Sequence, residues 1–308
     1  MKQLDMGFGN PTFLQDNDQI KLDKLHIVWI PEYDRSYKES GDKELKETIK
    51  KIHRKYKNAN TDFKHIVIGH GASHILQALI AVLQKPVYAK APYFSRFPTF
   101  TKNVGQIWIS EKMSKYSHIT QPVQIVTYPN NPDNKKNLST KCKTVIYDLS
   151  YNWPQYTEVT NLDADIMVFS LSKATGHSST RIGWAIIKDE QLANDVEEWI
   201  ENNTSGISIE AQESAKKILN SEINAPNNCS IMEYGKKILE DRWKLINKRK
   251  FPFKILNNSG MFAWCYGKPP TDIKYVKGSD CGMSDRYFRL NIGCSNKIFR
   301  KFLKYGRR

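Results

Sequence analysis

Short apolar runs alternate with segments of helical periodicity through the first two thirds of this 308-residue chain. Strands are predicted for the runs KHIVIG, PVYAKAP, QIWIS, VQIVTYP, TVIYD, ADIMVFSLS and RIGWAII. Helices are predicted over residues 42–57, 72–84, 96–103, 189–203 and 208–222. Strands that alternate with helices form sheets covered on both faces. The pattern therefore predicts an α/β fold with a mixed, mostly parallel sheet flanked by helices.

A different pattern begins near residue 230. The long helical stretch SIMEYGKKILEDRWKLINKRK is followed by three short apolar runs, FKIL, MFAWCYG and YFRLNIG. A helix followed by several strands is typical of an α+β unit. We therefore expect a smaller C-terminal α+β lobe beside the large domain.

The net charge of +15 raises the question of nucleic-acid binding. The lysines are spread from end to end, and no helix-turn-helix, zinc-finger or RNP-like motif accompanies them. A bias toward Lys, Asn and Ile explains the charge equally well. A nucleic-acid partner is therefore not expected.

The five cysteines are scattered, without a CxxC pair or a neighbouring histidine cluster. We expect free thiols and no metal site, as in a reducing compartment. The N-terminus lacks the features of a secretory signal, and the longest apolar stretch, ILQALIAVL, is too short to span a bilayer. These features predict a cytoplasmic protein without a membrane segment.

Polar residues follow several of the predicted strands. In chain order they are Ala72 and Ser73 in GHGAS, Asn131, Asp148, Tyr151, Ser170, Ser172, Lys173 and Arg181. Each alone has a structural explanation as a turn or helix cap, but Lys173 is unusual because it directly follows an apolar strand. Ligands of open α/β sheets bind at the carboxyl ends of the strands, so we expect these residues to form one site.

This set of groups matches the needs of pyridoxal 5'-phosphate. The cofactor requires a lysine amine, and burial keeps that amine unprotonated and nucleophilic. It requires a carboxylate against its ring nitrogen and a cationic, amide-rich cup for its phosphate. The sequence therefore predicts that Lys173 carries the cofactor and that Asp148 faces its ring nitrogen.

Three segments closely resemble one group of enzymes: YPNNPDN, YDLSYNWPQYTEV and FSLSKATGHSSTRIGWAII. They are similar to fold-type-I pyridoxal-phosphate enzymes, and more narrowly to the plant tryptophan-aminotransferase-related and alliinase group. Weaker similarity in GNPT, IVIGHGAS, APYFS, GKKILEDRW, FAW and YFRLNIGCS extends the resemblance over most of the chain. It implies an N-terminal segment (1–30) on the small lobe or a partner subunit, a large cofactor-binding domain (31–205) and a small domain (206–308).

The resemblance implies a role for each polar residue. Lys173 would be the Schiff-base lysine and the base that moves the α-proton, with Asp148 and Tyr151 as the other catalytic residues. Asn131 and Tyr151 would donate to the 3-oxygen of the ring. The phosphate would be held by Ala72, Ser73, Ser170, Ser172 and Arg181, and the neighbouring Leu149, Ser150 and Leu171 would complete the cofactor site.

The aromatic and C-terminal positions leave alternatives open. Tyr93 or Phe94 in APYFS would stack on the ring. Arg289 in YFRLNIG would clamp the substrate carboxylate, or would be a surface arginine. Three aromatics either line the substrate pocket or belong to the core: Trp153, Phe262 and Trp264.

The segment after GNPT departs from the family pattern. It reads FLQDNDQIKLDK and lacks the tyrosine that in this group crosses to the phosphate of the partner subunit. A homodimer is nevertheless expected by analogy, without the details of that contact.

The resemblance implies an aminotransferase that moves the amino group of an L-amino acid to a 2-oxo acid. The donor would be aromatic and tryptophan-like. The cysteine-rich N-terminal module of alliinases is absent from the sequence, which favours this branch. The alternatives are an alliinase-type carbon–sulfur lyase acting on S-alkyl-cysteine sulfoxides, and a catalytically weak family member.

Overall fold

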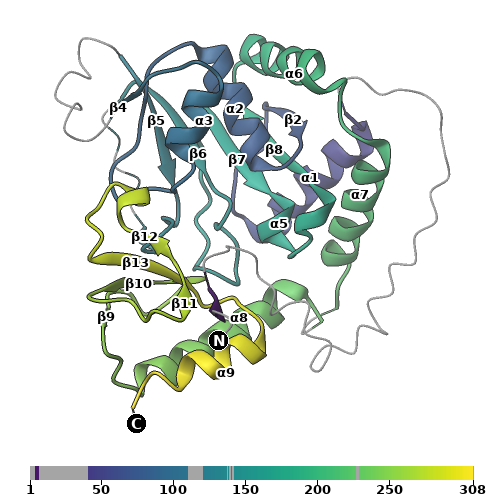
Figure 1. The fold of residues 1–308 in the computed structure, drawn as a ribbon. Coiled ribbons are helices and arrows are strands. Elements are labelled where there is room, and N and C mark those ends of the chain that lie inside the picture. Colours follow the sequence, from purple (N-terminus) through teal and green to yellow (C-terminus); the bar gives the residue numbers. More distant parts are fainter. Residues whose placement is uncertain are drawn as a thin grey trace.

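The computed structural model shows a large lobe built on one sheet and a smaller lobe beneath it (Figure 1). The structure describes residues 4–6, 41–109, 121–136, 138, 140, 142–226 and 229–307. Most of the N-terminal segment, including FLQDNDQIKLDK, lies outside the described residues. The prediction that this segment lacks the tyrosine that crosses to the phosphate of the partner subunit therefore also falls outside the described residues.

The large sheet has seven strands in the order β2-β8-β7-β6-β5-β3-β4. These are β2 (His65–Gly69), β3 (Val87–Tyr88), β4 (Trp108–Ile109), β5 (Val123–Thr127), β6 (Thr144–Asp148), β7 (Ile166–Ser170) and β8 (Gly183–Ile187). β8 runs antiparallel to both of its neighbours, and the other pairings are parallel. The predicted mixed, mostly parallel sheet is confirmed. β5, β7 and β8 are buried along their whole length, which agrees with their largely apolar sequences.

Helices flank this sheet, and all but the one at residues 171–174, part of which was predicted as the end of a strand, lie close to the residues predicted for them. They are α1 (Lys43–Tyr56), α2 (Ala72–Leu83), α3 (Phe97–Asn103), the short α5 (Leu171–Ala174), α6 (Glu190–Thr204) and α7 (Ile209–Ile223). α2 packs on β2, β7 and β8 and also contacts α3 and α6. Its first residue therefore lies at the end of β2, where the GHGAS turn places it.

A buried histidine joins α1 to the sheet. His53 is fully buried, and Trp184 Nε1 in β8 donates to its Nε2 at 2.9 Å. Its Nδ1 therefore carries the proton and donates to Asn58 Oδ1 at 2.7 Å. Trp153 and Phe169 pack around the same imidazole, and Trp153 is fully buried. Trp153 is thus part of the core, which decides between its two predicted roles.

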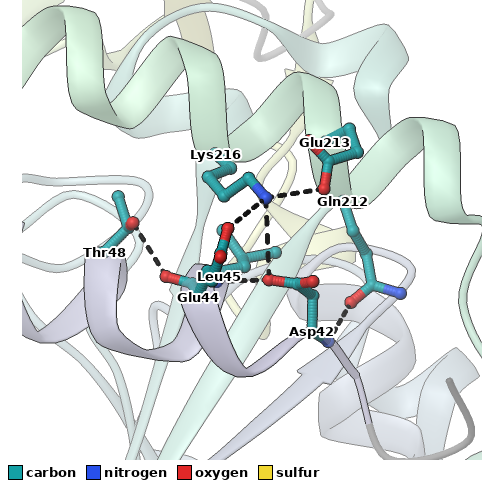
Figure 2. Close-up of polar contacts among 7 residues, drawn as sticks. All are labelled: Asp42, Glu44, Leu45, Thr48, Gln212, Glu213 and Lys216. Carbon is teal, nitrogen blue, oxygen red and sulfur yellow. Dashed lines mark hydrogen bonds and ion pairs between the residues drawn. The ribbon is translucent and has the colours of Figure 1, made fainter. Parts of the chain in front are cut away.

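The start of α1 is fixed by ion pairs to α7 (Figure 2). Lys216 Nζ lies 2.8 Å from Glu44, 2.6 Å from Glu213 and 4.0 Å from the N-cap residue Asp42. The Asp42 carboxylate accepts from Leu45 N at 2.7 Å. α7 therefore packs directly on the large lobe through α1.

The small lobe is built on a four-stranded antiparallel sheet in the order β12-β13-β10-β9. Its strands are β9 (Lys254–Ile255), β10 (Phe262–Tyr266), β12 (Val276–Lys277) and β13 (Tyr287–Asn291). The helices α8 (Ile231–Asn247) and α9 (Asn296–Leu303) lie along its lower side in Figure 1. β1 (Leu4–Asp5) pairs in parallel with β11 (Ile273–Lys274), so the chain start adds to this lobe.

The domain boundaries at residues 30 and 205 stay predictions. Among the helices that the structure describes, none is both long and apolar enough to cross a membrane.

Candidate active site

The carboxyl ends of two neighbouring parallel strands bring Asp148 and Lys173 together. Asp148 ends β6 and pairs in register with Val168 of β7. β7 ends at Ser170, and α5 follows immediately and carries Lys173. The amine and the carboxylate therefore share one edge of the sheet, and they are close enough to interact electrostatically.

The surroundings of Lys173 favour an unprotonated amine. Its side chain keeps some contact with solvent, but burial, followed by the cations Arg289 and Arg181, lowers its pKa to about 7. Asp148 opposes this shift. At neutral pH a large share of the amine is therefore a free base, as a nucleophile or proton acceptor requires.

Asp148 is a buried carboxylate held by its own loop. Ser150 donates to Asp148 Oδ1 twice, from its hydroxyl at 2.6 Å and from its backbone N–H at 3.1 Å. Burial raises the pKa of Asp148, and the Ser150 bonds and Lys173 counteract that rise. Ser150 thus favours the ionised form of the carboxylate and fixes its orientation.

The start of α2 forms an anion-binding cradle with Arg181. α2 begins at Ala72, has no acidic residue in its first turn and no side-chain cap, so its N-terminal N–H groups are available to an anion. The exposed Arg181 guanidinium donates to His70 O at 3.3 Å and to Ser172 Oγ at 3.5 Å. A Cβ on Gly71 would lie 2.6 Å from Arg181 Nη2, so glycine permits this approach.

The remaining predicted phosphate residues lie at the same strand ends. Ser73 occupies the first turn of α2, and Ser170 stands at the N-cap position of α5 without a side-chain capping bond. Leu171 is fully buried, and its N–H donates to Ile182 O at 3.0 Å, so it anchors α5 to the residue that precedes β8. Leu149 is likewise fully buried.

Arg289 reaches the site from the small lobe. It is only 4% exposed, so the alternative of a surface arginine is wrong. Its Nη1 donates to Asn131 Oδ1 at 2.7 Å, and its guanidinium lies 4.1 Å from the ring centre of Phe262. Tyr151 packs edge-on to Phe262 at 5.4 Å and interacts electrostatically with Arg289. Asn131, Tyr151 and Arg289 therefore meet where the two lobes touch.

The aromatic positions separate into two groups. Phe94 packs edge-on against Phe97 and Phe100 and belongs to the α3 core. Tyr93 instead packs against Trp108 at 5.0 Å and contacts Gly282 of the small lobe. Tyr93 is therefore the better placed of the two to reach a ligand between the lobes.

Comparison with known proteins places the chain in a family. Residues 5–264 match the family model described as Allinase. The chain belongs to the alliinase family. Tryptophan aminotransferase-related protein 2 of Arabidopsis thaliana is 30% identical over 279 residues, covering 80% of this chain and 61% of the relative. Alliin lyase 1 of Allium sativum is 32% identical over 246 residues, covering 72% of this chain and 49% of the relative. This alliinase-family chain thus spans between about half and three fifths of the length of these relatives.

Solved structures establish the fold of this alliinase-family chain. An aminotransferase from Staphylococcus aureus superposes with a TM-score of 0.72 at 16% identity, over 99% of this chain and 93% of that one. Aspartate aminotransferase from Thermus thermophilus with maleate gives 0.71 at 16% identity, over 99% and 91%. The fold is therefore that of the fold-type-I aminotransferases, as predicted. The fold and the family together imply the use of pyridoxal phosphate.

The residues of this alliinase-family site fit that cofactor. A lysine amine with a pKa of about 7 lies near a buried carboxylate. An uncapped helix start faces an arginine across Gly71, where a Cβ would fill the cradle. The lysine thus matches the aldehyde of the cofactor, the carboxylate matches its ring nitrogen, and the helix start with the arginine matches its phosphate.

Two parts of the site were not found in the sequence. Gln155 and Tyr156, which lie within the segment YDLSYNWPQYTEV, donate to the backbone of Lys173. Cys281, a buried thiol of the small lobe, interacts electrostatically with Arg289, and its carbonyl accepts from Tyr93 N at 3.1 Å. No periodicity marks residues 279–282, so only tertiary packing reveals their place.

Proposed function

We propose that this protein is a pyridoxal-phosphate-dependent aminotransferase, which moves the amino group of an L-amino acid to a 2-oxo acid. The observation that carries the proposal is the lowered pKa of Lys173 beside Asp148 and Arg289. Such a reaction needs an unprotonated amine, a carboxylate beside the ring nitrogen of the cofactor and a cation that binds the carboxylate of the substrate. The alliinase-family relationship supports the proposal.

When bound, the cofactor would supply an aldehyde that captures amino groups and a ring that withdraws electrons from the adjoining carbon. The amine of Lys173 would hold that aldehyde and, once released by an amino acid, would accept the α-proton. Asp148 would keep the ring nitrogen protonated, because an ionised buried carboxylate stabilises a neighbouring positive charge.

The other residues would orient the cofactor. Asn131 uses its oxygen to accept from Arg289, so its amide NH₂ can donate to the 3-oxygen of the ring. The Tyr151 hydroxyl would donate to the same oxygen, and burial raises its pKa, so it stays protonated. The N-terminal N–H groups of α2, together with Ser170, Ser172 and Arg181, would hold the phosphate.

Arg289 would bind the substrate carboxylate. Its guanidinium is already oriented by Asn131 and by the face of Phe262, so little freedom is lost when a carboxylate arrives. Phe262 and Tyr151 add apolar surface beside it. An aromatic amino donor of tryptophan-like shape suits such surroundings, in keeping with the names of the tryptophan aminotransferase-related relatives.

A carbon–sulfur lyase is the second candidate, favoured by the similarity to alliin lyases. It would use the same lysine for the α-proton but expel a β-substituent, so it would need no acceptor. The purified protein should be given an S-alkyl-cysteine sulfoxide, or tryptophan with 2-oxoglutarate. Oxo acid formed from tryptophan only when the acceptor is present supports the aminotransferase. Pyruvate in excess over enzyme without an acceptor would overturn it.

We also propose a homodimer, by analogy with fold-type-I enzymes, in a reducing compartment such as the cytoplasm. The structure describes all five cysteines and none of them forms a disulfide bond, which is typical of proteins kept reduced. Light scattering coupled to gel filtration tests the dimer, and a mass equal to one chain would contradict it.

A further inference from the structure

The helix that carries Lys173 is too short to hold its own C-terminal end. α5 spans only Leu171–Ala174, and the last carbonyl groups of any helix lack partners within the helix. Lys173 and Ala174 therefore present backbone oxygens that need donors from elsewhere, because buried carbonyl groups are seldom left unpaired.

Two side chains from the loop after Asp148 supply those donors. Gln155 Nε2 donates to Lys173 O at 3.0 Å and to Ala174 O at 2.7 Å. The Tyr156 hydroxyl donates to Lys173 O at 2.9 Å. Both side chains are buried, with 3% of Gln155 and 3% of Tyr156 exposed. Two hydrogen bonds thus hold the backbone oxygen of Lys173 and a third holds that of Ala174, all donated by two adjacent residues.

The same loop also carries the acid of the site. The loop starts at Asp148. Trp153 is fixed in the core beside His53, and its backbone oxygen accepts from Tyr156 N at 3.0 Å. Tyr156 packs edge-on against Tyr151 at 5.3 Å. One short, firmly packed segment therefore sets the place of both the carboxylate and the lysine.

We propose that Gln155 and Tyr156 are positioning residues, which hold the backbone of Lys173 so that its amine stays enclosed beside Asp148. The inference rests on the proposed function only in taking Lys173 as the reactive lysine. A loosened α5 would expose the amine to more water and move it away from Arg289 and Arg181, so its pKa would rise toward that of an ordinary lysine. Neither residue needs to touch substrate for this role.

The test uses Gln155→Met and Tyr156→Phe in the full-length chain. The first keeps the length of the side chain without its amide, and the second keeps the ring without its hydroxyl. Tyr128→Phe is the matched control, because Tyr128 is 4% exposed and its hydroxyl bonds Thr160 Oγ1 at 2.7 Å rather than Lys173. Circular dichroism establishes that each variant is folded.

The first readout needs no cofactor. Trace acetylation with acetic anhydride across a pH series, followed by peptide mass spectrometry, gives the titration midpoint of Lys173. We expect a midpoint near 7 in the parent and in Tyr128→Phe, and a rise of about one unit, tenfold in proton affinity, in the two other variants. An unchanged midpoint in folded Tyr156→Phe would overturn the proposal, as would an equal rise in Tyr128→Phe.

The second readout separates positioning from substrate binding. In protein loaded with pyridoxal phosphate, kcat should fall about tenfold or more while KM for the amino donor stays constant, because Arg289 is untouched. Should Gln155→Met fail to fold, Tyr156→Phe decides alone. In that variant Gln155 still donates to the carbonyl groups of Lys173 and Ala174, so α5 stays folded, and only the Tyr156 hydroxyl is lost. Failure to bind the cofactor would contradict the proposed function, whereas the acetylation result would still decide the role of these two residues.

Discussion

The substitution Ser150→Ala tests whether the Ser150 hydroxyl favours the ionised form of the Asp148 carboxylate. The Ser150 hydroxyl donates to Asp148 Oδ1 at 2.6 Å, and hydrogen bonds to charged groups contribute about 1.5–3 kcal/mol. One pKa unit corresponds to about 1.4 kcal/mol, so the pKa of Asp148, already raised by burial, should rise by a further one to two units or so. A protonated Asp148 cannot stabilise the protonated ring nitrogen. The acid limb of the kcat profile should therefore move to higher pH by about the same amount.

The cofactor-free protein gives a second assay of the same shift. A carboxylate whose folded pKa is raised contributes stability that is fully present below its unfolded pKa and is lost as the pH rises through the folded value. Ser150→Ala should thus have an unfolding free energy about 1.5–3 kcal/mol below that of the parent at neutral pH, and little below it at pH 3, as measured by urea unfolding. Thr101→Val is the control, because its fully buried hydroxyl donates to the neutral Phe97 O at 2.9 Å. A loss in Ser150→Ala that is independent of pH, with an unmoved acid limb, would refute the reasoning.

Three further substitutions test other parts of the molecule. Arg289→Lys should raise KM about tenfold for every L-amino acid alike, since all share the carboxylate; steady-state kinetics showing an effect on one donor alone would contradict its role. Gly71→Ala should weaken phosphate binding at least about tenfold by calorimetry, because its Cβ would lie 2.6 Å from Arg181 Nη2. Gly105→Ala is the control, because Gly105 has a similar positive φ and an added Cβ would meet no atom within 4 Å. Equally weakened phosphate binding in Gly105→Ala would point to backbone strain instead of the Arg181 contact. Burial lowers the pKa of His53 to about 4, so unfolding free energy should drop by roughly 3 kcal/mol as the pH falls from 7 to 4, and His53→Gln should lack most of that drop.

The sheet was predictable because its strands are short runs rich in apolar residues. β2, β5, β6, β7 and β8 lie within the runs chosen for them. α9 was not among the bounded helix predictions, because NKIFRKFL is short and its basic tail resembles a solvated helix face, yet Phe299, Phe302 and Leu303 are buried. The antiparallel direction of β8 also follows from tertiary structure, because a run of apolar residues does not carry its own direction.

The site was predictable where chemistry leaves few choices. A lysine after a buried strand and an aspartate after its neighbour are informative because parallel strands end at the same edge. The contribution of Gln155 and Tyr156 was not predictable, because their donors act on backbone oxygens and leave no pattern of residue types. The burial of Arg289 likewise depends on how the small lobe meets Asn131.

The most direct measurement of the central claim is where pyridoxal phosphate attaches. The purified chain should be incubated with the cofactor, reduced with sodium borohydride, digested and mapped by mass spectrometry. We predict a phosphopyridoxyl group on the peptide that contains Lys173, and its loss in Lys173→Ala. Labelling spread over surface lysines, or unchanged labelling in Lys173→Ala, would contradict the account.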